Sequence, residues 1–418
     1  MLMVTESVRL SRRAWCQGFG HGALAVLAGG AWVNTAAATR SDTKPAAQKP
    51  SAKPALFAAC WDNAQGGHHA GWLQVADAGG SVSVLRSTEL PTRGHGVALL
   101  PDGSLLVVAR RPGDWLLKLA AGKKPQWLWQ VPDRVFSGHV QVAGDGRTIY
   151  TTEIDTDSGQ GFLGMRDAQN LGKRAEYATN GRDPHAVLAL PALFSEAEAA
   201  QTSGRLGHFP AGMLFVANGG IDTRIETGRV KRHLQQMDSS IVGLHPATGE
   251  LLGQWRLPDN RLSLRHLAWA VPDDANPISG GPTLGIALQA EHDDPVQKAA
   301  APLLAVLDWA HQPEGGLHLA QGQPALAGYG GDITLAGRGR TAQWLVSATR
   351  GHQVARFGLD GDFVGSHPLL EAGALAKDSA MAWAGGRDAL MRVPQAALAP
   401  SALPLLGFGK IDNHWLRV

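Results

Sequence analysis

The feature that most constrains the fold is a sequence motif that recurs along the chain: a short apolar run, a glycine-containing turn and a second apolar run. In its clearest copy, residues 95–99 lead into the turn Pro101-Asp102-Gly103, and residues 105–108 follow. An Asp-Gly turn between apolar runs is typical of β-hairpins, because glycine readily adopts a positive φ. Units of this kind begin at residues 95, 139, 185, 266, 332 and 379, which are 44, 46, 81, 66 and 47 residues apart. The shorter spacings match a four-stranded propeller blade of about 40–50 residues.

The spacing predicts an all-β protein that folds as a single seven-bladed β-propeller. The six units give six blades, and a seventh is expected from N-terminal strands at 56–61, 71–75 and 83–90, closed by a C-terminal strand at 413–418. Polar stretches at 218–238 and 291–302 are expected to be insertions that account for the two long spacings. Six or eight blades are alternatives, whereas a two-sheet sandwich explains the regular spacing poorly.

The first 38 residues have the pattern of an export signal. Arg12-Arg13 precedes an apolar stretch at 18–33 that is too short and too weakly hydrophobic to span a bilayer permanently. Residues 36–38 are alanines, which suit a signal peptidase. The pattern predicts a twin-arginine signal peptide over residues 1–38, a periplasmic location and no stable membrane anchor. An ordinary secretory leader is the alternative, with the same destination outside the cytoplasm.

Composition separates the rest of the chain into two parts and excludes several kinds of site. Residues 39–55 are rich in Lys, Pro and Ala and are expected to be a linker, so the propeller domain is expected over 56–418. The formal net charge of +2 is too small to indicate nucleic-acid binding. Cys16 lies in the leader, so the mature protein is expected to have a single thiol, Cys60, with no internal disulfide and no Cys₂ zinc site. Cys60 is expected to be a buried hydrophobic residue.

Four of the repeated units carry a histidine at the start of their first strand. These residues are His95, His139, His185 and His266. The innermost strand of a propeller blade begins beside the central channel, so the four imidazoles are expected to converge there. Neutral imidazole binds iron, copper or zinc, and the same cluster would also suit an anionic ligand. The alternative is a structural role in hydrogen bonding between blades, and four blades are a wide spread for one tetrahedral ion, so two or three of the histidines would share it.

Polar residues near these histidines are candidates for binding a ligand. The candidates are Arg93, Arg110, Arg111, Asn218 and Arg265. Arg265 directly precedes His266, Arg93 lies two residues before His95, and the adjacent pair at 110–111 suits carboxylate or phosphate. Asn218 opens the long polar stretch, and loops of that length are often functional. Two other polar strings, at 68–69 and 291–294, are expected to be a surface hairpin tip and a solvated turn.

Seven segments match a known family in order along the chain. They are residues 90–96, 109–113, 150–153, 216–223, 248–250, 262–267 and 302–303. On these segments the chain resembles the exported bacterial proteins of domain-of-unknown-function family 1513. The resemblance implies a seven-bladed periplasmic propeller with a twin-arginine leader, and a role in iron acquisition, because members are often encoded beside iron-uptake proteins. The family supplies no catalytic residues, and Asp183-Pro184-His185-Ala186 stands here where the family tends to have Gly-Pro-His-Glu.

Together these observations predict a periplasmic binding or accessory protein of a metal-uptake system. The expected cofactor is a divalent metal ion, iron, copper or zinc, and the expected partners are other periplasmic metal-uptake proteins. A lactonase-like or oxidoreductase-like enzyme is one alternative, and a protein-interaction platform without a ligand is another, because the propeller fold serves many functions.

Overall fold

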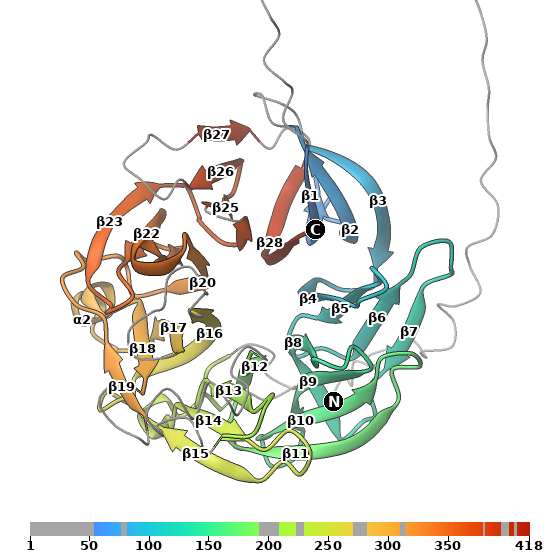
Figure 1. Ribbon diagram of the computed structural model, residues 1–418, viewed down its shortest axis with the longest axis horizontal. Helices are drawn as coiled ribbons and strands as arrows, with labels where there is room; N and C mark the ends of the chain where they lie inside the picture. The colour runs from blue at the N-terminus through green and yellow to red at the C-terminus, as the bar shows by residue number, and fades with distance from the viewer. Residues whose placement is uncertain are drawn as a thin grey trace, which may run out of the picture. The chain divides into compact units, whose positions relative to one another are not determined.

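The computed structural model describes residues 54–76, 82–191, 209–222, 230–270, 282–309, 315–378, 381–393, 401–404 and 408–418. The predicted signal peptide and residues 39–53 of the predicted linker lie outside this part of the chain. From Ala55 onward, seven antiparallel four-stranded sheets surround a common centre (Figure 1). The predicted all-β, seven-bladed propeller is therefore confirmed.

The first four blades follow one another in chain order, each with its innermost strand first. The first blade consists of β4 (Gly94–Leu99), β5 (Leu105–Ala109), β6 (Trp115–Leu119) and β7 (Gln126–Trp129), and the second of β8 (Arg134–Val142), β9 (Thr148–Asp155), β10 (Gln160–Asp167) and β11 (Lys173–Arg182). The third consists of β12 (Pro184–Ala189), β13 (Leu214–Asn218), β14 (Ser240–Leu244) and β15 (Leu251–Trp255). The fourth consists of β16 (Leu262–Ala270), β17 (Thr283–Ala290), β18 (Leu304–Asp308) and β19 (Gly316–Leu319). A one-turn helix, α2 (Pro295–Ala300), connects β17 to β18.

The last three blades complete the ring. They are β20 (Gly330–Ala336), β21 (Gln343–Ala348), β22 (Gln353–Phe357) and β23 (Phe363–Pro368); β24 (Leu375–Asp378), β25 (Met381–Gly385), β26 (Ala389–Val393) and β27 (Ser401–Pro404); and β28 (Phe408–Arg417) with β1 (Ala55–Asn63), β2 (His68–Val75) and β3 (Val82–Leu90). In the last of these, β28 is the innermost strand and pairs with β1 (Figure 1). The predicted closure of one blade by strands from both parts of the chain is confirmed.

Three details differ from the prediction. The unit start at 379 is one strand late, because residues 381–385 form the second strand of their blade and the short β24 precedes them. The string at 291–294 is not a solvated turn: Glu291 and His292 are buried, and the Asp294 side chain caps α2. The pair at 68–69 opens β2 instead of forming the hairpin tip.

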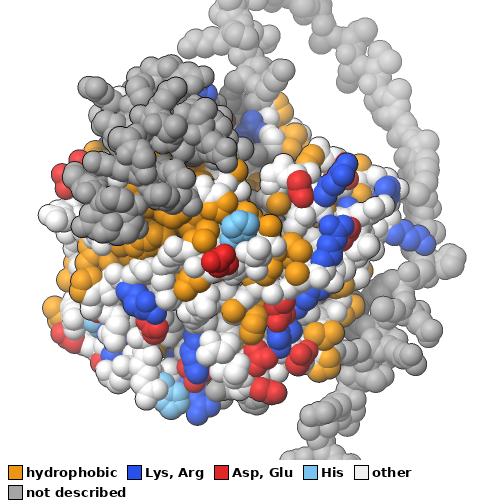
Figure 2. Space-filling model, turned by 60° about the horizontal axis from the view of Figure 1, so that its bottom comes forward, with side chains coloured by type: hydrophobic (Ala, Val, Ile, Leu, Met, Phe, Trp, Pro, Cys, Tyr) orange, Lys and Arg blue, Asp and Glu red, His pale blue; other side chains and the backbone are white. Residues whose placement is uncertain are grey.

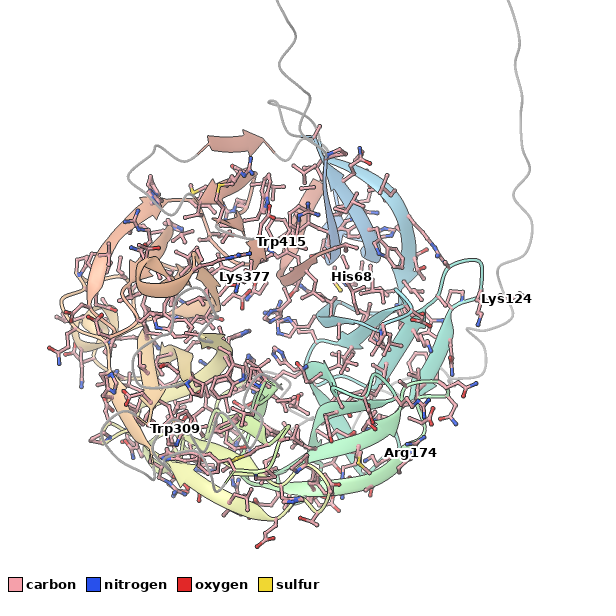
Figure 3. All side chains as sticks on the ribbon, viewed as in Figure 1. His68, Lys124, Arg174, Trp309, Lys377 and Trp415 are labelled. Carbon is pink, nitrogen blue, oxygen red and sulfur yellow. The ribbon has the colours of Figure 1, made fainter. Side chains whose placement is uncertain are left out.

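Apolar side chains fill the spaces between neighbouring blades. Trp115, Trp309 and Trp344 are among the largest side chains that are fully buried there, and Figure 3 labels Trp309 within the ring of blades. Cys60 is buried as predicted, in the cluster between β1 and β5. Burying a large apolar side chain contributes about 1.5–3 kcal/mol, so these contacts fix each inner strand relative to the next. In the part of the chain that the structure describes, no helix has the length and apolar character needed to span a bilayer.

Candidate metal centre in the propeller channel

A β-bulge interrupts the innermost strand of six blades. The pairing register shifts at residues 94–97 of β4, 136–140 of β8, 184–187 of β12, 264–267 of β16 and 330–333 of β20. In β28, residues 412–414 together lie opposite the single residue Cys60 of β1. A bulge redirects a side chain out of the regular alternation of a strand. Every one of these bulges contains a histidine or an aspartate, and in β28 it contains both.

Five histidine rings meet where these bulges face one another. They are His95 of β4, His139 of β8, His185 of β12, His266 of β16 and His414 of β28. Taken in that order and back to the first, neighbouring ring centroids are 4.5 to 5.1 Å apart. Figure 3 shows nitrogen-bearing side chains projecting into the centre of the ring of blades. The structure therefore brings the four predicted histidines together and adds His414, which the sequence had placed only in the closing strand.

The nitrogens of these rings lie at distances that suit shared ligation. Three overlapping triads have ligand atoms within 4.8 Å of one another: His95, His139 and His414; His139, His185 and His266; and His266, Asp332 and His414. The Nε2 atoms of His185 and His266 are 3.0 Å apart. Two nitrogens bound tetrahedrally to one zinc ion at about 2.0–2.1 Å would lie roughly 3.3 Å apart. The arrangement thus fits two ligands of one ion as well as it fits a hydrogen bond.

The five imidazoles are held in the neutral form that binds metals. Burial lowers the pKa of His95, and it lowers the pKa values of His139, His185, His266 and His414 well below 6.5. Two of the ring nitrogens, Nε2 of His139 and Nε2 of His414, are buried without a hydrogen-bond partner. An unpartnered buried polar atom is costly, at about 1–3 kcal/mol, and such atoms are rare in native proteins.

Two buried carboxylates contact the outer nitrogens of the rings. Asp412 Oδ1 lies 2.6 Å from Nδ1 of His95. Asp332 of β20 lies 3.5 Å from Nδ1 of His266 and 3.7 Å from Nδ1 of His414. A ligating histidine usually donates its second N–H to a carboxylate, which fixes the tautomer and leaves the other nitrogen free for the metal. Sequence reasoning missed both aspartates, although Asp332 occupies the place in its unit that histidine occupies in four others.

The four predicted arginines lie beside this cluster and pair with two aspartates. Asp412 Oδ2 accepts from Arg93 Nε at 2.5 Å and from Arg110 Nη1 at 3.4 Å. The fully buried Asp183 accepts from Arg265 Nη1 at 2.7 Å and from Arg111 Nη1. Each carboxylate therefore faces two guanidinium groups, and the surroundings of the histidines carry excess positive charge.

The fifth candidate for ligand binding, Asn218, lies in a different environment. It is fully buried at the end of β13, and its Nδ2 donates to the Thr179 carbonyl of β11 at 2.8 Å. This bond ties two neighbouring blades together. A small cavity of about 20 Å³ beside the histidines is lined instead by Arg110, Arg111 and Arg265.

Fold and site together define a seven-bladed β-propeller whose channel holds a cluster of buried histidines. The chain belongs to the family DUF1513, a protein family of unknown function, whose model matches residues 88–418. The resemblance found in the sequence is thereby confirmed. No curated protein matches the chain.

Solved structures share the fold at low sequence identity. A proposed 6-phosphogluconolactonase from Bacteroides uniformis is 14% identical with a TM-score of 0.52, and the match covers 87% of this chain and 99% of that one. A protein from Lactobacillus plantarum is 13% identical with a TM-score of 0.50, covering 88% and 100%. The hydrazine synthase of Kuenenia stuttgartiensis is also 13% identical with a TM-score of 0.50, covering 80% and 92%. At this identity the similarity shows the propeller fold alone.

Proposed function

We propose that this protein binds a divalent transition-metal ion on its channel histidines and acts as a periplasmic binding or accessory protein of a metal-uptake system. The observation that carries the proposal is the meeting of five neutral imidazoles in three overlapping triads, each with its ligand atoms within 4.8 Å. Uncharged imidazole nitrogens that face one another across so short a distance are Lewis bases, and a cation between them would satisfy several at once.

A purely structural role for the histidines explains fewer of the observations. Structural histidines are expected to have both ring nitrogens hydrogen-bonded, because buried polar atoms are nearly always paired. Here the Nε2 atoms of His139 and His414 have no such partner. The carboxylates contact His95, His266 and His414 at Nδ1, so Nε2 is the nitrogen of each ring that remains for the centre of the channel. In His266 this nitrogen lies 3.0 Å from Nε2 of His185.

The chemistry of the cluster narrows the choice of metal. Its possible ligands are imidazole nitrogens and the Asp332 carboxylate, with no thiolate in the triads. Imidazole and carboxylate ligands suit iron, copper(II) and zinc. The periplasmic location and the metal-uptake partners rest on the sequence pattern of residues 1–38 and on the family resemblance.

Elemental analysis tests the proposal. The wild-type protein, exported through its own leader and then incubated with iron, copper or zinc and desalted, is expected to retain close to one ion per chain. The double variant His139→Ala/His266→Ala is expected to lose it, since every one of the three triads contains at least one of these two residues. His318→Ala, on the outermost strand β19, is the matched control and keeps the metal.

Two results would overturn the proposal. One is a folded wild-type protein, with normal circular dichroism, that retains none of the three metals after desalting. The other is equal retention by the wild type and the double variant. Turnover of a lactone by the metal-loaded protein, lost in the double variant, would instead make the centre catalytic.

A further inference from the structure

A larger cavity, of about 480 Å³, adjoins the small one beside the histidines. The two cavities share three wall residues, Arg110, Tyr329 and Asn413, so they are contiguous. Volumes of roughly 300–1,000 Å³ are typical of small-molecule sites. The larger cavity, called the outer cavity below, is therefore large enough for a small organic ligand that reaches toward the channel.

The walls of the outer cavity are strongly basic. Its described lining contains four permanent cations and one carboxylate; the cations are Arg93, Arg110, Arg350 and Lys410. The carboxylate, Glu371, pairs with Lys410 at 3.6 Å and also with Arg387, which is not part of the lining. The Arg350 guanidinium lies over the Tyr329 ring, 4.4 Å from its centroid.

Two of these cations, Arg93 and Arg110, share the buried Asp412 behind the wall, so the four cations face two carboxylates and a positive excess remains. Other parts of the surface are balanced more evenly. Arg256 pairs with Asp238, and Arg261 pairs with Asp293, so the charges of these residues are balanced locally. On the face shown in Figure 2, Lys and Arg side chains likewise lie next to Asp and Glu side chains. A concave site with an excess of one sign concentrates ligands of the opposite sign.

An unpartnered guanidinium edge lies further inward. Arg265 is 1% exposed and lines the small cavity. Its Nη1 donates to Asp183, but its Nε and Nη2 are buried without a hydrogen-bond partner. These two N–H groups form the edge of a guanidinium that binds a carboxylate or phosphate through two parallel hydrogen bonds. The cavity beside it, about 20 Å³, has room for one oxygen atom.

From these observations we infer that the outer cavity binds a small organic polyanion, bearing carboxylate or phosphate groups, with one oxygen directed toward Arg265 and the histidines. The basic walls would hold the anionic groups, and the arginine geometry matches both kinds of oxyanion. The inference goes beyond metal binding and does not require it, because arginine carries its charge whether or not the histidines hold an ion.

Calorimetric titration of metal-free protein tests the inference. The probes are citrate for carboxylates and inorganic phosphate and glucose 6-phosphate for phosphates, at low ionic strength. The variant Arg350→Gln/Lys410→Gln removes two lining charges at partly exposed positions, so it is expected to fold normally. Lys124→Gln/Arg174→Gln removes the same charge at the outer rim, where Figure 3 labels both residues.

At least one probe is expected to bind the wild type and the rim variant equally, and to bind the cavity variant about tenfold or more weakly, since charge-assisted hydrogen bonds are lost. Added salt should weaken the binding. Preference for citrate or for the phosphates identifies the oxyanion. Absence of binding by all three probes at millimolar concentration overturns the inference, and so does equal weakening in both variants. Because the protein is metal-free, either outcome leaves the metal proposal to its own test.

Discussion

Two buried carboxylates lie next to the histidine cluster, and they behave differently. Asp412 is 1% exposed and Asp332 is 6% exposed, and each occupies the bulge of an inner strand. Asp412 accepts hydrogen bonds from Arg93, Arg110 and His95. Its Oδ1 also accepts from the backbone N–H of Asn413. Asp332 has no arginine partner among these contacts: it accepts from two backbone N–H groups, those of residues 333 and 375, and faces neutral imidazoles.

The pKa values of the two aspartates move in opposite directions. Burial alone would raise the pKa of Asp412, but His95 and the two arginines outweigh burial and hold that pKa well below its usual range. Burial raises the pKa of Asp332 from 3.8 to about 6, because the hydrogen bonds and histidines around it compensate only in part. Similar burial therefore gives a carboxylate whose pKa is lowered on one side of the cluster and one whose pKa is raised to about 6 on the other.

Replacing Asp412, the carboxylate paired with arginines, should have the largest effect on stability. Asp412→Asn leaves Arg93 and Arg110 without their shared anion in a buried site. Breaking a buried ion pair in this way costs about 3–5 kcal/mol. We expect the free energy of unfolding, measured by chemical denaturation at pH 7, to fall by about that amount. A loss below about 1 kcal/mol, typical of exposed pairs, would show that the two arginines are solvated. The ion pairs of Asp412 would then not distinguish it from Asp332.

The pH dependence of stability should separate the two residues next. Because folding raises the pKa of Asp332 from 3.8 to about 6, its protonated form stabilises the folded state below pH 3.8, and this contribution is lost as the pH rises through 6. In metal-free protein, the free energy of unfolding of the wild type relative to Asp332→Asn should fall by roughly 2.4 kcal/mol between pH 4 and pH 7.

Asp412→Asn is the matched control for this measurement. The pKa of Asp412 lies below the same window, so the residue stays ionised and the corresponding difference should remain nearly constant from pH 4 to pH 7. A wild-type advantage over Asp332→Asn that grows with pH would contradict the assigned direction of the Asp332 shift.

The smallest effect is expected on metal affinity. The 2.6 Å contact of Asp412 with His95 Nδ1 is shorter than the 3.5 and 3.7 Å contacts of Asp332. Loss of a carboxylate that orients a ligating histidine weakens metal binding by about 10–100-fold. Competition with a chelator should therefore show at least about tenfold weaker zinc binding for folded Asp412→Asn and a smaller change for Asp332→Asn. The reverse order would make Asp332 the carboxylate that matters more to the metal.

The fold and part of the histidine cluster were predictable because the inner strands of several blades carry the same sequence pattern at equivalent positions. His95, His139, His185 and His266 each start an apolar run before a turn, so equivalent positions in a propeller brought them together. Asp332 occupies the same position of its unit and was predictable from that position, although the residue there is an aspartate and not a histidine.

His414 and Asp412 could not be recognised from the repeat. They belong to the strand that completes a blade begun by β1–β3, so no turn and second strand follow them in the sequence. The sixth unit was predicted to start at residue 379, one strand too late, for a related reason. Its inner strand β24 is only four residues long and contains no glycine-histidine pair. Glu291 was expected in solvent because its neighbours in sequence are polar, whereas its partners Lys231 and Lys298 come from other segments.

Strand β28 gives the centre a defined order of assembly. Among the described strands it is the last that a ribosome would synthesise, and the blade it completes is the one that β1–β3 began. It also carries Asp412 and His414, so two of the three triads lack a member until it docks. A nascent chain would therefore be unable to hold an ion in its complete coordination sphere before the ring has closed.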